Sequence, residues 1–488
     1  MKKVHGSLMN GGHMKRLSWY LYGFIFLILP QFLLAQIPDQ ALSIPPLLEF
    51  ERSADGKKVF NLTAQEGSMP FFSGQQTATM GFNGNYLGPT IRVRRNDEVS
   101  IHVKNSMGES TTVHWHGADV PAEADGGPHQ PIPSQSTWTA QFPIRQQAAT
   151  LWYHPHLMGK TAEHVYNGLA GLFIIDDEIS DALPLPREYG VDDIPLILQE
   201  RRFERDGSFS YRPRMPDLMH GYTGNEILSN GGIEPSVDVK AGIIRLRLLN
   251  GSSSTMLRLS FEGGEIMHQI ASDGGFLEAP LPFESLILSP GERAEILVDF
   301  TQKSRSSRSR RNEVPVLLAQ SSGGITRKVL EFRVGRQPGV QNTIPSELRK
   351  VERIPREEAS QTRRFEMRTR MMGRMVINGK AMSLRRVDEQ VKLGDTEIWE
   401  VVNGDSGSGM MNQPHNFHIH AVQFQVLSYN GQAPPPEWRG WKDTISLWGG
   451  DRVELIARFT SYPGLFMYHC HFLEHEDAGM MGQFEIVE

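Results

Sequence analysis

The stretch MYHCHFLEHEDAGMM, residues 467–481, contains the only cysteine among the 488 residues of the chain. Cys470 lies between two histidines, His475 follows five residues later, and Met480 follows ten residues later. One cysteine cannot form an internal disulfide, and a lone buried cysteine usually packs as a small hydrophobic residue. Here the neighbours are soft and borderline metal ligands, so the stretch favours a metal site.

Ten of the chain's 17 histidines lie in four short segments. These segments are HWH (residues 114–116), HPH (154–156), HNFHIH (415–420) and HCHFLEH (469–475). A single histidine is more often a surface or core residue than a metal ligand. Four clusters at such short spacing favour metal binding instead.

Each segment contains two histidines that are separated by one residue. Residues i and i+2 of a β-strand share a face, so both histidines of such a pair point the same way. The pairs are His114 with His116, His154 with His156, His418 with His420, and His469 with His471. Four pairs from distant parts of the chain could form one pocket with up to eight imidazoles, whereas a structural zinc ion needs four ligands. The pattern therefore predicts several metal ions in one pocket.

The same alternation points Cys470 to the opposite face, and so to a second site. His415 and His475 remain free to join it, and Met480 offers a thioether. A thiolate, two imidazoles and a weak axial thioether are the ligands of a blue-copper electron-transfer centre. The His-Cys-His tripeptide would then join the two sites covalently.

The rest of the chain reads as mostly β-strand, because short alternating or β-branched runs recur between Gly, Pro and Asn turns. Examples are TIRVRRNDEVSIHVKN (Thr90–Asn105), IIRLRLLNG (Ile243–Gly251) and RVELIARF (Arg452–Phe459). This spacing suits antiparallel sandwiches. A weak repeat, IHVKN, LRLLNG and WEVVNG, suggests three copies of one β-domain.

The N-terminal segment predicts export. Lys15 and Arg16 precede an apolar stretch, Ser18–Ala35, which has the layout of a secretory signal over residues 1–35. This stretch is short and interrupted for a membrane anchor, so we expect a periplasmic or secreted protein without stable membrane insertion. Lys15–Arg16 is not a twin-arginine pair, which leaves the export route open. A formal charge of −6 gives no reason to expect a nucleic-acid partner.

The sequence resembles the multicopper oxidase family over roughly residues 40–488, with all four HxH motifs in the order of that family. HWHG, WYHPH…GLAG and HCHFLEHEDAGMM carry the resemblance. Within the family the chain is most similar to the bacterial copper-efflux oxidases and bacterial laccases. The phrases ASDGG (Ala271–Gly275), GERAEILVD (Gly291–Asp299) and GWKDT (Gly440–Thr444) support this placement.

This resemblance implies an all-β fold of three cupredoxin-like Greek-key β-sandwich domains that hold four copper ions. Proline-bearing joints place the domains at residues 36–182, 190–336 and 360–488, and the middle domain has no copper ligands. The implied ligands are His415, Cys470, His475 and Met480 for type 1 copper, His114 and His418 for type 2 copper, and His116, His154, His156, His420, His469 and His471 for the type 3 pair.

The implied activity is one-electron oxidation of a reducing substrate, coupled to four-electron reduction of dioxygen to water. Asp125, eleven residues past His114, and Glu476, directly after His475, would act as catalytic proton relays. Alternatively, each carboxylate only orients a histidine. Cell-division proteins that resemble this family share the fold but lack the copper ligands, whereas every ligand position is filled in this chain. The filled positions argue against a non-enzymatic copper store or a purely structural role, which is the remaining alternative.

The substrate is expected to be Cu(I), phenols or both, so a role in copper tolerance and a dedicated phenol or pigment laccase are both open. Copper-efflux oxidases carry a methionine-rich insert over the type 1 site, which this chain lacks. It has instead Met367, Met371, Met372 and Met375, with Met410 and Met411 before His415. Thioethers favour Cu(I), although such a run also packs cores. The shorter cover predicts that the edge of the type 1 copper site is exposed to solvent, so that bulky phenols can reach it. We expect a monomer.

Overall fold

The computed structural model describes residues 37, 40–209, 211–302, 314–340, 343–370, 373–406 and 413–488. Contacts divide the chain into a unit Met1–Leu33, which lies outside the described residues, and a unit Leu34–Glu488, to which the following description applies. The expected signal segment and Met371, Met372, Met410 and Met411 also lie outside the described residues. Among the described residues, no helix is both long and apolar enough to span a membrane.

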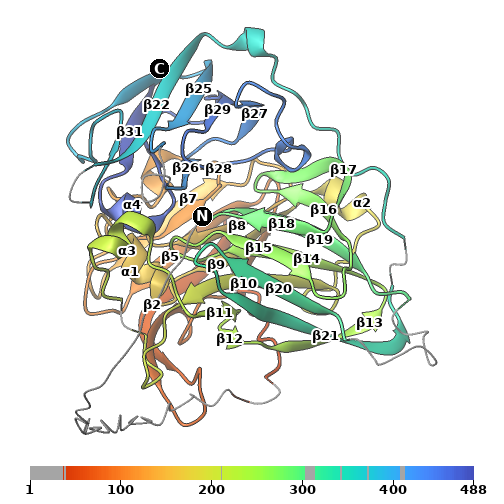
Figure 1. The fold of residues 1–488 in the computed structure, drawn as a ribbon. Coiled ribbons are helices and arrows are strands. Elements are labelled where there is room, and N and C mark those ends of the chain that lie inside the picture. The colour runs from red at the N-terminus through yellow and green to blue at the C-terminus, as the bar shows by residue number, and fades with distance from the viewer. Residues whose placement is uncertain are drawn as a thin grey trace, which may run out of the picture. The chain divides into compact units, whose positions relative to one another are not determined.

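The described chain is built almost entirely from β-strands, which form six sheets within these residues (Figure 1). The prediction of an all-β fold is confirmed. The helices are short: α1 (Thr161–Tyr166), α2 (Glu178–Ala182), α3 (Met215–His220), α4 (Leu473–Asp477), and the 3-10 turns η1 (Ala122–Ala124), η2 (Arg356–Glu358) and η5 (Pro436–Trp438).

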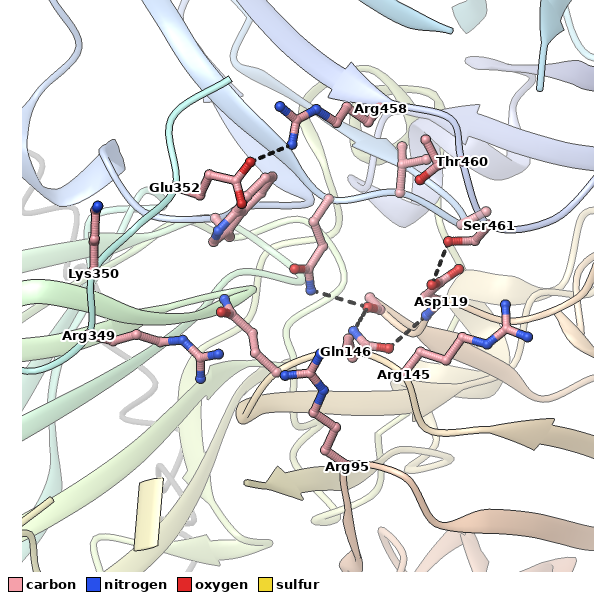
Figure 2. A pocket seen from close by; sticks show the side chains of 16 residues that line it. Arg95, Asp119, Arg145, Gln146, Arg349, Lys350, Glu352, Arg458, Thr460 and Ser461 are labelled. Atoms are coloured by element: carbon pink, nitrogen blue, oxygen red, sulfur yellow. Dashed lines mark hydrogen bonds and ion pairs between the residues drawn. The ribbon is translucent and has the colours of Figure 1, made fainter. Parts of the chain in front are cut away.

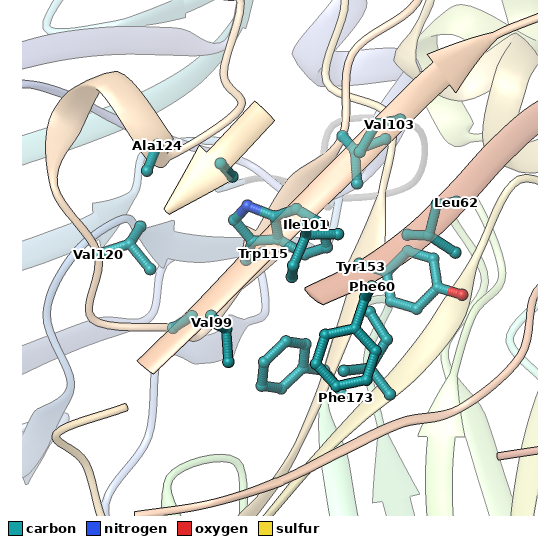
Figure 3. Packing of buried hydrophobic residues seen from close by; sticks show 14 of the residues in the cluster. Phe60, Leu62, Val99, Ile101, Val103, Trp115, Val120, Ala124, Tyr153 and Phe173 are labelled. Carbon is teal, nitrogen blue, oxygen red and sulfur yellow. The ribbon is translucent and has the colours of Figure 1, made fainter. Parts of the chain in front are cut away.

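Two sheets come from residues 51–176. One has the order β1 (Glu51–Arg52), β2 (Lys58–Met69), β5 (Glu98–Asn105), β7 (Thr137–Pro143), with β3 (Thr77–Phe82) beside β2; the other has the order β4 (Ile91–Arg94), β9 (Gly171–Asp176), β8 (Ala149–His154), β6 (His114–His116). Their apolar faces enclose one core, in which Phe60, Ile101, Trp115 and Phe173 pack (Figure 3). Trp115 therefore points into this core, away from the two histidines that flank it, as the strand alternation predicts.

The next two sheets come from residues 193–338. One has the order β12 (Gly232–Ile233), β11 (Glu226–Ser229), β10 (Asp193–Arg201), β14 (Ile243–Asn250), β19 (Arg293–Asp299), β16 (Met267–Ser272), β17 (Gly275–Phe283); the other has the order β13 (Ser236–Ala241), β21 (Thr326–Pro338), β20 (Val316–Ser321), β15 (Leu257–Phe261), β18 (Ser285–Leu288). A second apolar core fills the space between them.

The last two sheets come from residues 361–487. One has the order β23 (Arg374–Ile377), β22 (Gln361–Arg370), β25 (Thr396–Asn403), β29 (Arg452–Arg458), β27 (Phe424–Tyr429); the other has the order β24 (Glu389–Lys392), β31 (Met481–Val487), β30 (Gly464–His469), β26 (His415–Ile419), β28 (Thr444–Leu447). Met367 and Met375 are fully buried in the core between these sheets and pack there.

Strand direction differs from the antiparallel arrangement that the sequence suggests. Most pairs are antiparallel, but each of the six described sheets contains one parallel pair. Turn signals predict the direction only of strands that a hairpin joins. Turn signals do not predict the direction of two paired strands when the chain visits the opposite sheet between them. The three-domain division stays a prediction, which the separate cores of the three segments support.

The histidine segments lie on neighbouring strands. In the first segment β6 pairs with β8, which sets His114 opposite His154. In the last segment β26 pairs with β30, which sets His418 opposite His469. Opposite residues on paired strands lie about 5 Å apart, so strand pairing alone brings two HxH motifs together in each sheet. Contact between the two sheets then joins the two pairs of motifs.

Candidate metal centres

Eight histidines from the two sheets meet in one buried centre, in which every side chain is at most 1% exposed. They are His114, His116, His154, His156, His418, His420, His469 and His471. Ring nitrogens face each other across the centre: Nε2 of His469 lies 3.1 Å from Nε2 of both His156 and His420. Nε2 of His154 lies 3.4 Å from Nδ1 of His116 and from Nε2 of His471. The structure therefore brings together all eight histidines of the predicted pairs.

Several ring nitrogens of this centre lack a hydrogen-bond partner within the described part of the chain. These buried atoms are Nε2 of His114 and His418 and Nδ1 of His471. A buried polar atom without a partner is energetically costly, and metal coordination satisfies an imidazole nitrogen. The nitrogens of His114, His418 and His420 also lie within 4.8 Å of one another. The residues thus fit a group of metal ions.

The protonation state of the rings also suits metal binding. Burial, together with the neighbouring imidazoles, holds the pKa of five of these histidines well below its ordinary value: His116, His154, His418, His420 and His471. Burial also lowers the pKa of His156 to about 4. Neutral imidazole is the form that coordinates a metal, so the fold keeps these rings ready to bind.

Backbone carbonyls orient the rings of the centre. Nδ1 of His114 lies 3.0 Å from the Asp125 carbonyl oxygen, and Nδ1 of His418 lies 2.8 Å from the Asp443 carbonyl oxygen. Such bonds fix the ring and leave Nε2 pointing inward. His116 is turned the other way, with Nε2 3.1 Å from Oδ1 of Asp443, so Nδ1 points inward.

A second buried centre contains His415, Cys470 and His475. The sulfur lies 3.7 Å from Nδ1 of His415 and 3.8 Å from Nδ1 of His475, and these two nitrogens are 3.1 Å apart. Met480 is fully buried, and its carbonyl accepts a hydrogen bond of 3.0 Å from the Cys470 amide. All four residues predicted for this site therefore lie together.

Cys470 has no disulfide partner and is fully buried. Burial raises the pKa of this thiol to about 12. Since the thiolate is the form that binds metal, a cation at the sulfur is needed to hold it at neutral pH. Backbone groups of Asn416 and Phe472 near the sulfur favour the charged form and oppose this shift.

The sequence showed Asp405 upstream of His415 but assigned it no role at the second centre. No carboxylate lies immediately before His415, but Asp405, ten residues upstream, places Oδ2 3.0 Å from Nε2 of His415. The same carboxylate accepts from the Thr369 amide. Asp405 therefore fixes the ring so that Nδ1 faces the sulfur.

The open copper edge expected from the short cover is absent among the described residues. His475 is 1% exposed and His415 is fully buried. Helix α3 packs on α4, which carries His475, and the backbone of Met219 lies next to the imidazole of His475. The prediction failed because this cover comes from the middle segment, about 255 residues away along the chain.

The two candidate catalytic carboxylates lie at the histidine centre. Oδ2 of Asp125 is 2.8 Å from Nδ1 of His420, and its Oδ1 is 3.3 Å from Nδ1 of His114. Oε2 of Glu476 is 3.1 Å from Nδ1 of His469. Burial acts to raise the pKa of Glu476, but the imidazoles beside it hold that pKa below its usual range.

A further carboxylate, Asp443, was not singled out from the sequence. It is fully buried and accepts from His116, from the Thr444 hydroxyl at 2.9 Å and from the guanidinium of Arg293. One ring nitrogen each of His116 and His418 lies within 4.8 Å of its oxygens. Asp443 lies in the phrase GWKDT, and Arg293 lies in the phrase GERAEILVD. A buried charge in such a phrase is the signal that points to a role at the site.

The loop before β19 contacts Asn416, which follows His415 and bonds to the His471 amide. Nδ2 of Asn416 donates to the Ser289 hydroxyl at 3.1 Å and to the Pro290 carbonyl at 2.8 Å. Oδ1 of Asn416 accepts from the His471 amide at 2.6 Å. The middle segment supplies none of the predicted ligands, yet through Asn416 it positions the chain next to Cys470.

Models of the multicopper oxidase family match residues 63–180 and 355–488. The chain is 36% identical to multicopper oxidase mco of Staphylococcus aureus over 92% of both chains, and 38% identical to cell division protein FtsP of Dickeya dadantii over 91% of both. Among solved structures it is similar to the laccase-like multicopper oxidase CueO of Ochrobactrum sp., with 39% identity and a TM-score of 0.83 over 91% of this chain and 100% of that one. A laccase of Pediococcus acidilactici gives 35% identity and a TM-score of 0.84 over 93% and 95%.

Proposed function

Since the chain belongs to the multicopper oxidase family, we propose that it oxidises its substrate at a mononuclear copper site and reduces dioxygen to water at a cluster of three coppers. The family implies copper cofactors, dioxygen and a reducing substrate. The observation that carries the detailed proposal is the grouping of the twelve predicted ligands into two buried centres. The tripeptide His469–Cys470–His471 belongs to both centres and joins them.

We assign His415, Cys470, His475 and Met480 to type 1 copper. For type 2 copper we assign His114 and His418, because Nε2 of each is buried without a partner among the described residues. The type 3 pair receives His116, His154, His156, His420, His469 and His471. Copper bound in this way would supply one-electron redox chemistry at the sulfur site and four-electron chemistry toward dioxygen at the histidine site.

The protein's own residues provide the electron path. Cys470 lies in the second centre, and the two residues covalently attached to it point their rings into the first centre. An electron that enters at the sulfur would therefore reach the histidine centre through the bonds of a single tripeptide. Burial of every ring excludes bulk water from this path.

Protons reach the histidine centre through Asp125 and Glu476. Oδ1 of Asp125 and both carboxylate oxygens of Glu476 are buried, and they lie 3.1–3.4 Å from imidazole nitrogens of the centre. Oxygens in this position can hold a proton and pass it to a group bound between the imidazoles. Both carboxylates also orient their histidines, as the short contacts to His420 and His469 require.

Two substrate classes have support. Helix α3, whose Met219 backbone and His220 lie beside His475, also carries the thioethers of Met215 and Met219, and thioethers favour Cu(I). The CueO of Ochrobactrum, by contrast, has oxidase activity toward lignin model compounds and lignosulfonate. We propose laccase-like activity toward phenols together with Cu(I) oxidation, the latter serving copper tolerance.

Oxygen uptake by the copper-loaded protein, with Cu(I) and with 2,6-dimethoxyphenol in parallel, tests this proposal. A Met215→Leu/Met219→Leu variant should raise the KM for Cu(I) about tenfold, the effect of about 1.4 kcal/mol of binding, and leave the KM for the phenol unchanged. Met80→Leu, in the first core, is the matched control. Copper uptake without oxygen consumption would overturn the enzymatic proposal and favour the structural role of the cell-division relatives.

We also propose that the protein is exported after removal of residues 1–35 and acts as a monomer in the periplasm or outside the cell. The charged and apolar composition of this segment supports export. N-terminal sequencing of the protein from the periplasmic fraction should begin at or near residue 36. A full-length chain that stays in the cytoplasmic fraction would contradict the localisation.

A further inference from the structure

A basic pocket of about 410 Å³ lies where three distant stretches of the chain meet (Figure 2). The stretches are residues 95–147, residues 349–352 and residues 421–461. Its charged lining residues are Arg95, Arg145, Arg349, Lys350 and Arg458, against Asp119 and Glu352. Positive charge therefore exceeds negative charge in the lining.

Two of these cations are already neutralised by neighbours. Arg458 contacts Glu352 at 2.9 Å and Glu358 at 2.9 Å. Arg349 pairs with Asp177 outside the pocket. These contacts hold both arginines in place, so they shape the wall of the pocket and contribute little uncompensated charge.

The other three cations, Arg95, Arg145 and Lys350, form no ion pair with any residue that the structure describes. The Arg145 guanidinium lies 4.7 Å from the centre of the Tyr462 ring. In Figure 2, Arg349 and Lys350 approach from one side, Arg145 from the other, and Arg95 from below. Like charges gathered around one space repel each other, so the empty arrangement is unfavourable.

The negative charge of Asp119 in the lining is also reduced. Oδ2 of Asp119 accepts the Ser461 hydroxyl at 2.7 Å, and burial raises the pKa of Asp119. Thr460 and Trp441, which also line this space, are uncharged. A ligand with several oxygen acceptors and at least two negative charges matches this lining.

The floor of the pocket adjoins the histidine centre. Gly117 and Ala421 line the pocket and directly follow His116 and His420. Gly117 has φ of +86°, and a Cβ there would lie 2.5 Å from Oδ2 of Asp443. Only glycine permits the backbone at this position to pack so closely against Asp443. Gly117 therefore separates the pocket from the carboxylate that holds His116.

We propose that this pocket binds a small polyvalent oxyanion, of the phosphate or polycarboxylate class, which links the three stretches above His116 and His420. Arg95 and Arg145 contribute from the first segment, and Lys350 from the joint that precedes the last segment. Because the anion binds only where all three stretches are in place, it stabilises the folded state by mass action. This inference does not depend on the substrate at the type 1 site.

Titration calorimetry of the copper-loaded full chain tests the proposal, with inorganic phosphate and with citrate as separate probes and ionic strength held constant with sodium chloride. We expect saturable binding of at least one probe and a higher thermal midpoint in its presence. An Arg95→Gln/Lys350→Gln variant should weaken binding at least tenfold and lose the thermal shift. The replaced side chains are exposed and unpaired among the described residues, so the fold should be retained.

Arg205→Gln/Arg214→Gln, in a different basic hollow, is the matched control and should bind as the parent does. Binding of phosphate alone would assign the pocket to phosphates, and binding of citrate alone would assign it to polycarboxylates. Absence of saturable binding for both probes would overturn the proposal. An equal loss in the control variant would also overturn it, because it would indicate general charge screening.

Discussion

Arg293 donates to both carboxylate oxygens of Asp443, at 2.7 Å from Nη1 to Oδ1 and at 2.5 Å from Nη2 to Oδ2. Both side chains are fully buried, and Arg293 is the first residue of β19 in the middle segment. Asp443 in turn accepts from Nε2 of His116. A segment without predicted ligands therefore sets the orientation of a ring in the histidine centre.

Replacement of Arg293 by Met should therefore damage the cluster as well as the fold. Breaking one partner of a buried ion pair costs about 3–5 kcal/mol, since the remaining carboxylate stays buried and charged. We expect lower stability, loss of copper from the histidine centre and a changed type 2 signal in electron paramagnetic resonance. Arg293→Lys should restore stability in part, but not the type 2 signal, because an ammonium cannot make the two-point contact.

The control for this prediction is Arg356→Met. Arg356 pairs with Glu454 at 2.7 Å, but its side chain is 55% exposed. Such surface pairs contribute about 0–1 kcal/mol, so copper content and the type 2 signal should not change. A normal type 2 signal in Arg293→Met would contradict the positioning role.

Asp125→Asn and Glu476→Gln should each slow oxygen reduction by about 10²–10⁴-fold while copper content stays normal, the range that loss of a positioned acid or base gives. Stopped-flow reoxidation of the reduced protein by dioxygen measures this step directly. Glu163→Gln, on helix α1, serves as the control. If the variants instead lost copper and kept the rate per bound copper, both carboxylates would be orienting groups only.

Met480→Leu should raise the reduction potential of the type 1 copper and keep its blue colour. Removing the axial thioether withdraws a donor that stabilises the oxidised metal, and the volume of the side chain changes little. Met467→Leu alters another buried methionine, on the neighbouring strand β30, and should leave the potential unchanged. Identical potentials in the two variants would exclude Met480 as the axial ligand.

A buried charge cluster in the middle segment predicts how stability depends on pH. Burial acts to raise the pKa of Asp193 and Glu295, but Arg245 and Arg247 hold both values below their usual range. Carboxylates with a lowered folded pKa stabilise the fold above their ordinary pKa of about 4. This contribution is lost as pH falls below that value toward the folded pKa. The denaturation midpoint should therefore be level near neutral pH and fall in acid.

Arg247→Met should lower stability by about 3–5 kcal/mol at pH 7, and the difference from the parent should shrink as pH falls, because protonation removes the unpaired charges. Urea unfolding at a series of pH values measures this difference. Arg94→Met, which breaks an exposed pair with Asp181, is the control. A difference that stays constant with pH would show that the arginine acts through packing alone.

Local periodicity explains what the sequence could predict. Alternation along strands placed His114 and His116 on one face and Trp115 in the core, and it grouped the histidines that the fold brings together. These inferences need only residues one or two positions apart.

Contacts between distant segments could not be predicted in this way. Arg293 and Asp443 are 150 residues apart, and α3 covers His475 from the middle segment. No periodic pattern links such positions, and the parallel strand pairs depend on the same long-range crossings. Only a three-dimensional arrangement identifies residues that act on a site from another sheet.

The most direct test of the central claim is the visible absorption spectrum of the copper-loaded protein beside that of Cys470→Ser. A copper–thiolate bond at Cys470 predicts an intense blue band in the parent and its complete loss in the variant, with oxidation of both Cu(I) and phenol abolished. Copper in the histidine centre should remain. A parent protein without the blue band, or a variant that keeps full oxidase activity, would contradict the account.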